Sequence, residues 1–297
     1  MSWLPNALHR VTDREAGGTG RFRRPVLITS ASLPVKLVLF AAIIVGVAAI
    51  LAPWLPLQDP LEQDLQSILT GPTSENLLGT DQLGRDLLSR TLWGARTTLL
   101  AAMVAAGVAG IIGIPAALIA GYRRGWIETA LNRSSDVIMT VPALVMLLAV
   151  QAALQTGIYG SMVTLGIILA PHLYRVIRSE VLTISNSSFL QSGRLSGCSH
   201  RRIILRYVLP NVREQAVVQL SFQFGFGLMV EAGISFLGVG VQPPDPSLGS
   251  LLNGTMSLIS REPMLVFAPG GVLVLLILAF NLAGDLLRTK SKAKHGD

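Results

Sequence analysis

Six long apolar stretches, separated by polar segments, dominate the pattern of this 297-residue chain. An α-helix needs about 20 apolar residues to cross the hydrocarbon core of a bilayer, and the stretches have roughly that length. We place them near Leu33–Leu55, Thr97–Gly121, Asp136–Thr156, Ile158–Tyr174, Gln215–Gly240 and Met264–Leu287. The pattern therefore predicts an all-α integral membrane protein with six transmembrane helices in contact with membrane lipid.

Basic residues are distributed unevenly between the two sides of these predicted spans. With six spans, 20 of the 24 Lys and Arg residues lie on the side that carries both termini. The other side holds only Arg85, Arg90, Arg96 and Arg261. Because basic residues collect on the cytoplasmic side, we expect both termini in the cytoplasm. The net charge of +7 then reflects topology, and we expect no nucleic-acid partner.

Composition agrees with a membrane protein. Hydrophobic residues make up 51% and charged residues 14% of the chain, and its mean hydropathy of +0.55 is too high for an ordinary soluble domain. The first stretch is long enough to remain as a span, although Ala48, Ala49 and Ala52 leave a cleaved signal peptide as an alternative. The single cysteine, Cys198, cannot form an internal disulfide.

These assignments divide the chain into a cytoplasmic tail (residues 1–32), a membrane domain (33–288) and a second cytoplasmic tail (289–297). The membrane domain includes a long outer loop (57–96) and a basic cytoplasmic loop (175–214). In the outer loop, the i,i+4 spacing of Asp81–Arg85 and Asp86–Arg90 predicts a short surface helix with ion pairs. Alternatively, Asp81, Arg85 and Asp86 dock an extracytoplasmic or membrane partner.

Motifs for catalysis or for metal binding are missing from the sequence. It contains no G-x-x-x-x-G-K-[ST] phosphate loop, and its four histidines are scattered without an H-E-x-x-H pair. We therefore expect no enzyme, no cofactor and no metal site in this chain. The energy for any transport must come from a partner or from an ion gradient.

The cytoplasmic loop carries the strongest positive signal, in the segment Phe189–Pro210, FLQSGRLSGCSHRRIILRYVLP. It has a basic side and an apolar side, with Gly197 as a helix breaker and Pro210 as a turn or helix start. This predicts two short helices lying at an angle in the interface plane. A basic loop that binds anionic lipid is the alternative.

This segment resembles the coupling loop of ABC importer permeases. Gly197, Leu209 and Pro210 match that loop, whereas Gln191, Ser192 and Gly193 stand where the family has Glu-Ala-Ala. Four further segments resemble permeases for dipeptides, oligopeptides and nickel: Leu77–Arg90 (LLGTDQLGRDLLSR), Asp136–Leu148 (DVIMTVPALVMLL), Glu231–Leu252 (EAGISFLGVGVQPPDPSLGSLL) and Leu278–Arg288 (LAFNLAGDLLR). Together they cover nearly the whole chain and point to the second, C-type permease subunit.

The resemblance implies the type I importer architecture in the cytoplasmic membrane of a prokaryote. It also implies a second homologous permease subunit, two cytoplasmic ATPase subunits that bind ATP and magnesium, and an extracytoplasmic substrate-binding protein. Transport would then follow alternating access, with the coupling loop moved by the ATPases. Short peptides are the implied substrate, while nickel or another small solute stays open.

Glu231 is the ionisable residue deepest in a predicted span. A charge there is costly unless it is paired or hydrated, and Gln219 and Gln223 share its helix face. One interpretation is that Glu231, Gln223 and Gln219 line or gate the translocation path; the other is a hydrogen-bonded structural residue. A different class of protein, an ion-coupled secondary transporter using Glu231, would favour inverted repeats, and the sequence shows no convincing one.

Overall fold

The structure is a computed structural model that describes residues 33–187, 190 and 198–295. Its regular elements there are helices, with one isolated bridge between Thr80 and Asp86. The long ones are α1 (Leu33–Leu51), α2 (Leu87–Arg123), α5 (Ile158–Ser185), α8 (Leu209–Phe236) and α10 (Met264–His295). The shorter ones are η1 (Ala52–Trp54), α3 (Trp126–Thr140), α4 (Ala143–Leu154), α7 (His200–Ile203), the π-helical η2 (Ile204–Val208), α9 (Leu248–Leu252) and η3 (Met256–Leu258). The all-α prediction is confirmed.

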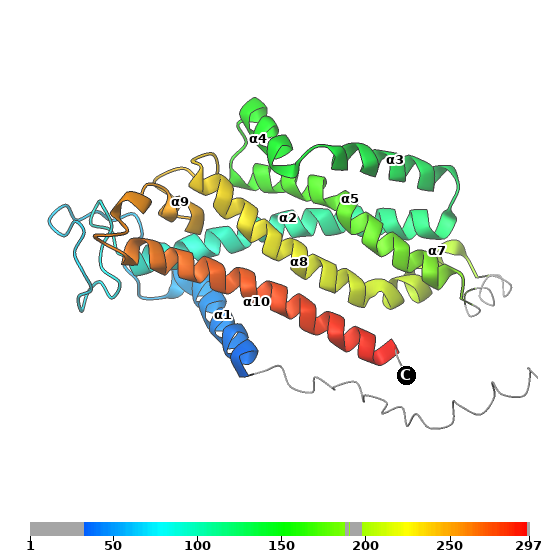
Figure 1. Ribbon diagram of the computed structural model, residues 1–297, viewed down its shortest axis with the longest axis horizontal. Coiled ribbons are helices and arrows are strands. Elements are labelled where there is room, and N and C mark those ends of the chain that lie inside the picture. Colours follow the sequence, from blue (N-terminus) through cyan, green and yellow to red (C-terminus); the bar gives the residue numbers. More distant parts are fainter. Residues whose placement is uncertain (1–32, 188–189, 191–197, 296–297) are drawn as a thin grey trace, which may run out of the picture.

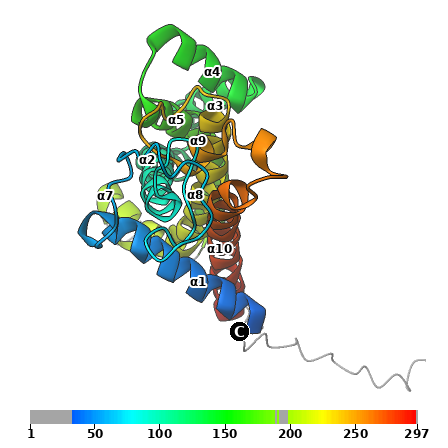
Figure 2. The ribbon, with the colours of Figure 1, turned by 90° about the vertical axis from the view of Figure 1, so that its left-hand side faces the viewer.

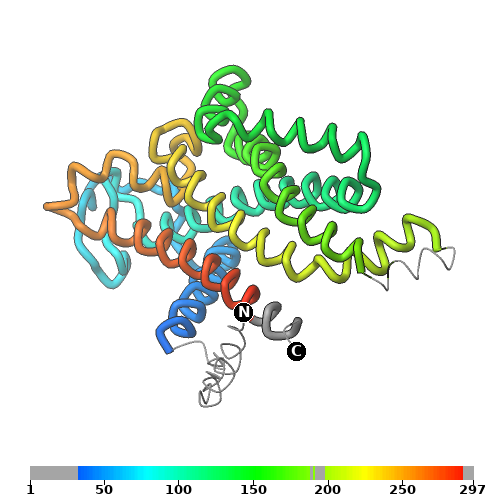
Figure 3. The backbone as a smooth tube through the Cα atoms, turned by 45° about the vertical axis from the view of Figure 1, so that its right-hand side comes forward, coloured from blue at the N-terminus to red at the C-terminus, as the bar shows by residue number. Residues whose placement is uncertain are grey.

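Four long helices, α2, α5, α8 and α10, run along the length of the molecule (Figure 1). The segment between α1 and α2 lies at one end together with α9, and α7 lies at the other. Seen from that first end, α2 lies within the bundle, whereas α1 and α4 lie at opposite margins (Figure 2). The helix α1 is inclined to the bundle and crosses α10 (Figure 3).

Small residues let α2 and α5 approach closely. A Cβ on Gly113 would lie 2.8 Å from the carbonyl oxygen of Ala170, and one on Gly166 would lie 2.6 Å from that of Ala105. Small side chains are the usual means of close helix contact in lipid, where no hydrophobic force drives helices together. The contact continues into an apolar cluster that includes Leu173.

The described residues include five helices long and apolar enough to span a membrane, or six if the bent pair α3 and α4 counts as one span. The third predicted span, Asp136–Thr156, is not one straight helix, because α3 and α4 are bent by 83°. Pro142 explains the break. Its ring disfavours helical backbone at the preceding residue, and Val141 is extended, with φ −94° and ψ 130°.

Helices reach further beyond the apolar stretches than we expected. The helix α5 extends to Ser185 rather than ending near Tyr174, and a continuous helical segment over His200–Phe236 replaces a span that begins at Gln215. Pro210 lies in the first turn of α8, where its missing N–H costs little. The described part of the cytoplasmic loop therefore consists of the end of α5, and of α7, η2 and the start of α8 in one continuous segment.

Candidate functional site

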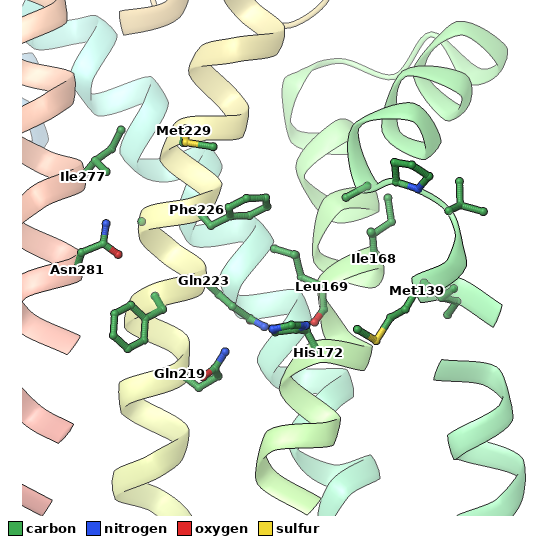
Figure 4. Close-up of a pocket in the computed structure, with 16 residues that line it drawn as sticks. Met139, Ile168, Leu169, His172, Gln219, Gln223, Phe226, Met229, Ile277 and Asn281 are labelled. Carbon is green, nitrogen blue, oxygen red and sulfur yellow. The ribbon is translucent and has the colours of Figure 1, made fainter. Parts of the chain in front are cut away.

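A cavity of about 570 Å³ lies between the α3–α4 bend, α5, α8 and α10. Figure 4 shows its side chains converging from these elements. The apolar wall includes Met139, Ile168, Phe222, Phe226, Met229 and Ile277. The bend itself contributes Val141 and Pro142. Irregular backbone at membrane depth is tolerated where it lines a cavity, so the bend and the cavity are parts of one feature.

The polar lining of the cavity comes from four side chains: His172, Gln219, Gln223 and Asn281. None of the described residues that line the cavity is Asp, Glu, Lys or Arg. Gln223 is buried, with only 4% of its surface exposed. Its Nε2 donates to the carbonyl oxygen of Leu169 on α5 at 3.2 Å. Its Oε1 has no hydrogen-bond partner among the described residues. Figure 4 shows Gln223 extending from α8 toward α5, the helix that carries His172.

Polar contacts tie α3, which carries one edge of the cavity, to α5. Asp136 pairs with Arg175 at 2.5 Å, and Glu128 pairs with Arg178. Between these pairs the Tyr174 hydroxyl donates to Asn132 Oδ1 at 2.8 Å. The three α3 residues are spaced four apart, so they share one face of the helix. These contacts hold α3 against α5 and thereby position the bend.

Glu231 does not line this cavity. It is fully buried, and its Oε1 accepts a hydrogen bond from the Ser235 hydroxyl at 2.7 Å. The side chains of Thr98 and Ser247 also lie close to its carboxyl group. Its Oε2 makes no hydrogen bond to the described residues. The structure therefore brings Gln219 and Gln223 together at the cavity and leaves Glu231 outside it.

The surroundings of Glu231 fasten the segment after α8 to α2 and α8. Ser235 Oγ accepts from the Val241 N–H at 3.1 Å, and Thr98 Oγ1 accepts from the Leu248 N–H at 3.1 Å. Space here is very tight, since a Cβ on Gly249 would lie 2.2 Å from the Ala232 carbonyl oxygen. We call the region formed by Thr98, Glu231, Ser235 and residues 239–252 the Glu231 cluster.

Charged residues of the outer loop form a turn, not the expected surface helix. Asp81 pairs with Arg85 at 2.7 Å, as its spacing predicted, but its second partner is Arg90 at 3.3 Å. The expected Asp86–Arg90 pair is absent from the described contacts because Asp86 caps α2, accepting from the Ser89 N–H at 2.7 Å. Gly84 has φ +70°, and a Cβ there would overlap the Asp64 carbonyl. This glycine is a signal for a turn that the i,i+4 interpretation missed.

The predicted coupling residues are only partly described. Gln191, Ser192, Gly193 and Gly197 lie outside the described residues. Leu209 packs against the apolar cluster at the C-terminal ends of α2 and α5, and Pro210 follows it in α8. The short helix α7 contacts α2 through the Tyr122 hydroxyl and His200 Nδ1, 3.0 Å apart.

Sequence reasoning missed two residues of the cavity, His172 and Asn281. Each is a polar side chain that interrupts an apolar run within its helix, which is the signal that could have found them. Among the described residues, no three His, Cys, Asp or Glu side chains gather closely enough to hold a metal ion. The arrangement offers hydrogen bonds and apolar contact to a ligand that is neutral or that combines polar and apolar groups.

Comparison with known proteins decides the family. Residues 113–292 match the family described as "binding-protein-dependent transport system inner membrane component". The chain belongs to this family of ABC importer permeases. The permease is 33% identical over 240 residues to the dipeptide transport system permease DppC of Alkalihalophilus pseudofirmus, covering 81% of this chain and 79% of that protein.

Two further relatives extend this similarity. The permease is 35% identical over 246 residues to the di/tripeptide transport system permease DppC of Pseudomonas aeruginosa, covering 81% of each chain. It is 34% identical over 269 residues to the glutathione transport system permease GsiD of Escherichia coli, covering 90% of this chain and 86% of that protein. The resemblance stated from the sequence motifs is confirmed, and the permease is a membrane component rather than an enzyme.

Proposed function

We propose that this permease imports di- and oligopeptides across the cytoplasmic membrane in an ATP-driven complex. The observation that carries the proposal is its identity of 33–35% to permeases named for dipeptides, di/tripeptides and glutathione, over at least 81% of the chain. The neutral cavity supports it, because peptides offer the neutral hydrogen-bonding groups that such a lining can satisfy.

The complex that we propose contains a second homologous permease subunit, two cytoplasmic ATPases and an extracytoplasmic substrate-binding protein. ATP and magnesium are bound by the ATPases, since this chain has no phosphate loop. Both termini lie in the cytoplasm, which the distribution of Lys and Arg supports. The binding protein docks at the end formed by the outer loop, where Asp81, Arg85 and Asp86 make hydrogen bonds within a turn and at the start of α2.

Coupling to the ATPases takes place at the opposite end, around residues 191–210. The contact between Tyr122 and His200 supports this role, because it joins the helix nearest the loop to α2, which runs the length of the molecule. A displacement of α7 is passed on to α2, and through the continuous segment His200–Phe236 to α8, which lines the cavity.

Import is tested in proteoliposomes that hold the complete complex. Uptake of a radiolabelled tripeptide should need ATP inside the vesicles and the binding protein outside them, and should persist when a protonophore collapses the proton gradient. Uptake driven by a proton gradient without ATP would instead support the secondary transporter. Competition by unlabelled nickel, in place of competition by unlabelled peptide, would move the substrate to the nickel branch.

Coupling is tested by cross-linking from Cys198, the only cysteine in the chain, which lies beside α7 and is partly buried. A short thiol-to-amine reagent should join it to an ATPase subunit. A Cys198→Ser permease should give no product. Labelling of Cys198 only by a membrane-impermeant thiol reagent added outside intact cells would contradict the topology.

A further inference from the structure

We propose that the cavity at the α3–α4 bend binds the amide backbone of the peptide in transit. In this proposal, Gln223 Oε1 accepts a hydrogen bond from a peptide N–H. The inference rests on the proposed peptide import and assigns the groups that recognise the substrate within this subunit.

The first argument is the unpartnered acceptor of Gln223. The neighbouring Leu169 group is a carbonyl oxygen, which can only accept, so the amide branch that faces it must be the Nε2 donor. This contact fixes the orientation of the amide and leaves Oε1 as the free branch. Gln223 is only 4% exposed, its Oε1 has almost no accessible surface, and no described atom donates to it, so a peptide N–H reaches Oε1 by displacing neighbouring side chains of the lining. Buried polar atoms without partners are uncommon, and a missing ligand is one explanation for them.

The second argument is the chemistry of the lining. Gln219 and Asn281 add two more amides, each with a donor and an acceptor, while Ile168, Phe226 and Met229 supply apolar surface. With no described charged residue in the lining, the site does not select for a charged side chain. The backbone amide is the one group that all peptides share. Such a site contacts every peptide without holding any of them tightly, as a transport path requires.

The third argument is position. Gln223 is the fifteenth of the 28 residues of α8, midway between its ends. The cavity is flanked there by a broken helix, and interrupted helices near mid-membrane are where transporters place substrate groups. A volume of about 570 Å³ lies within the range of small-ligand sites, roughly 300–1,000 Å³.

The test compares a peptide with an analogue that lacks N–H groups. Proteoliposomes with the complete complex take up labelled trialanine, or the depsipeptide of the same length in which both internal amides are esters. The permease is wild type, Gln223→Met, or Gln215→Met as a matched control on the same helix outside the cavity. The binding protein is the same throughout, so any change in the amide-to-ester ratio between permeases arises in the membrane subunit.

Gln223→Met should lower trialanine uptake about fivefold, the effect of one net hydrogen bond, and leave depsipeptide uptake within about twofold. Gln215→Met should match the wild type. An unchanged amide-to-ester ratio would overturn the proposal, whether the uptake of both substrates falls equally or neither falls. An equal fall would mean that Gln223 only ties α8 to α5.

A second variant covers the case in which Gln223→Met does not assemble. Gln223→Asn keeps the amide but withdraws it by one methylene, so its amide-to-ester ratio should fall below that of the wild type. A ratio equal to the wild-type value would overturn the proposal. Failure of the wild-type complex to import any peptide with ATP would instead refute the proposed function and is seen before any variant is compared.

Discussion

Two buried polar side chains of α8, Gln223 and Glu231, lie eight residues apart in opposite kinds of surroundings. Each has an oxygen without a hydrogen-bond partner among the described residues. Gln223 borders a cavity of about 570 Å³. Glu231 is fully buried in the Glu231 cluster, where the side chains of Thr98, Ser235 and Ser247 lie close to its carboxyl group.

The difference shows that an unpartnered buried oxygen indicates a ligand only where there is room for one. At Gln223 the adjoining cavity gives a substrate room to approach, and in our proposal the substrate supplies the missing donor. At Glu231 the backbone of residues 239–252 packs closely, since a Cβ added to Gly249 would lie only 2.2 Å from the Ala232 carbonyl oxygen. A role for Glu231 in the translocation path stays a prediction, whereas its contacts are those of a fastening between α8 and the segment that follows it.

We expect the largest effect from a substitution that disrupts the packing of the Glu231 cluster. Gly249→Ala places a Cβ against the backbone of Ala232, which cannot move aside as a side chain would. We expect a destabilisation of about 3 kcal/mol, the upper range for overpacking, and a marked loss of complex on size-exclusion chromatography. Gly225→Ala, at the cavity, is the matched control. Its Cβ would lie 3.2 Å from the Asn281 side chain, so the complex should assemble nearly as the wild type does.

The next effect separates fastening from transport at Glu231. Glu231→Leu leaves the Ser235 hydroxyl without its acceptor, at a cost of about 1–3 kcal/mol. We expect less assembled complex but unchanged transport for each complex formed. Glu231→Gln keeps an acceptor and should assemble better than Glu231→Leu. A normal amount of complex with transport abolished would contradict the fastening and favour the path interpretation.

Much of the fold could be predicted because hydrophobic length and charge asymmetry act locally along the chain. The apolar stretches located the membrane helices, and the family motifs indicated the architecture. Helix ends were predicted less well, because hydropathy reports where the lipid ends and not where the hydrogen bonds of the helix end. That is why α5 continues past Tyr174 to Ser185 and α2 begins at Leu87 rather than near Thr97.

The candidate site was harder to predict because it depends on rotation and bending. Helical spacing placed Gln219, Gln223 and Glu231 on one face, but it could not show that the segment after α8 folds back over Glu231 and leaves the two glutamines beside a cavity. Pro142 disfavours helical backbone at the residue before it, but the size of the resulting bend, 83°, exists only in three dimensions. Sequence spacing also paired Asp86 with Arg90, because it could not show that Asp86 caps α2.

The smallest expected effect extends the comparison to Asp86, outside the membrane-spanning helices, whose buried Oδ1 has no partner among the described residues. Burial raises the pKa of Asp86 above its ordinary value of 3.8, against hydrogen bonds from the Ser89 and Leu88 N–H groups that lower it. The folded protein therefore holds this proton more tightly than the unfolded chain does. Its contribution to stability is present below pH 3.8 and is lost as the pH rises through the raised pKa.

Asp64 provides the opposite case, because it is exposed and hydrogen bonds from Ser67 and Gln66 lower its pKa. Its contribution is present above pH 3.8 and is lost as the pH falls through the lowered pKa. Thermal unfolding of the purified permease, followed from about pH 3 to about pH 7, should reveal both signs as differences from the wild type. Relative to the wild type, Asp86→Asn should gain stability as the pH rises, and Asp64→Asn should lose it. Two differences of the same sign would mean that Asp86 Oδ1 has a hydrogen-bond partner in solution. Asp86 would then not be comparable to Gln223 or to Glu231.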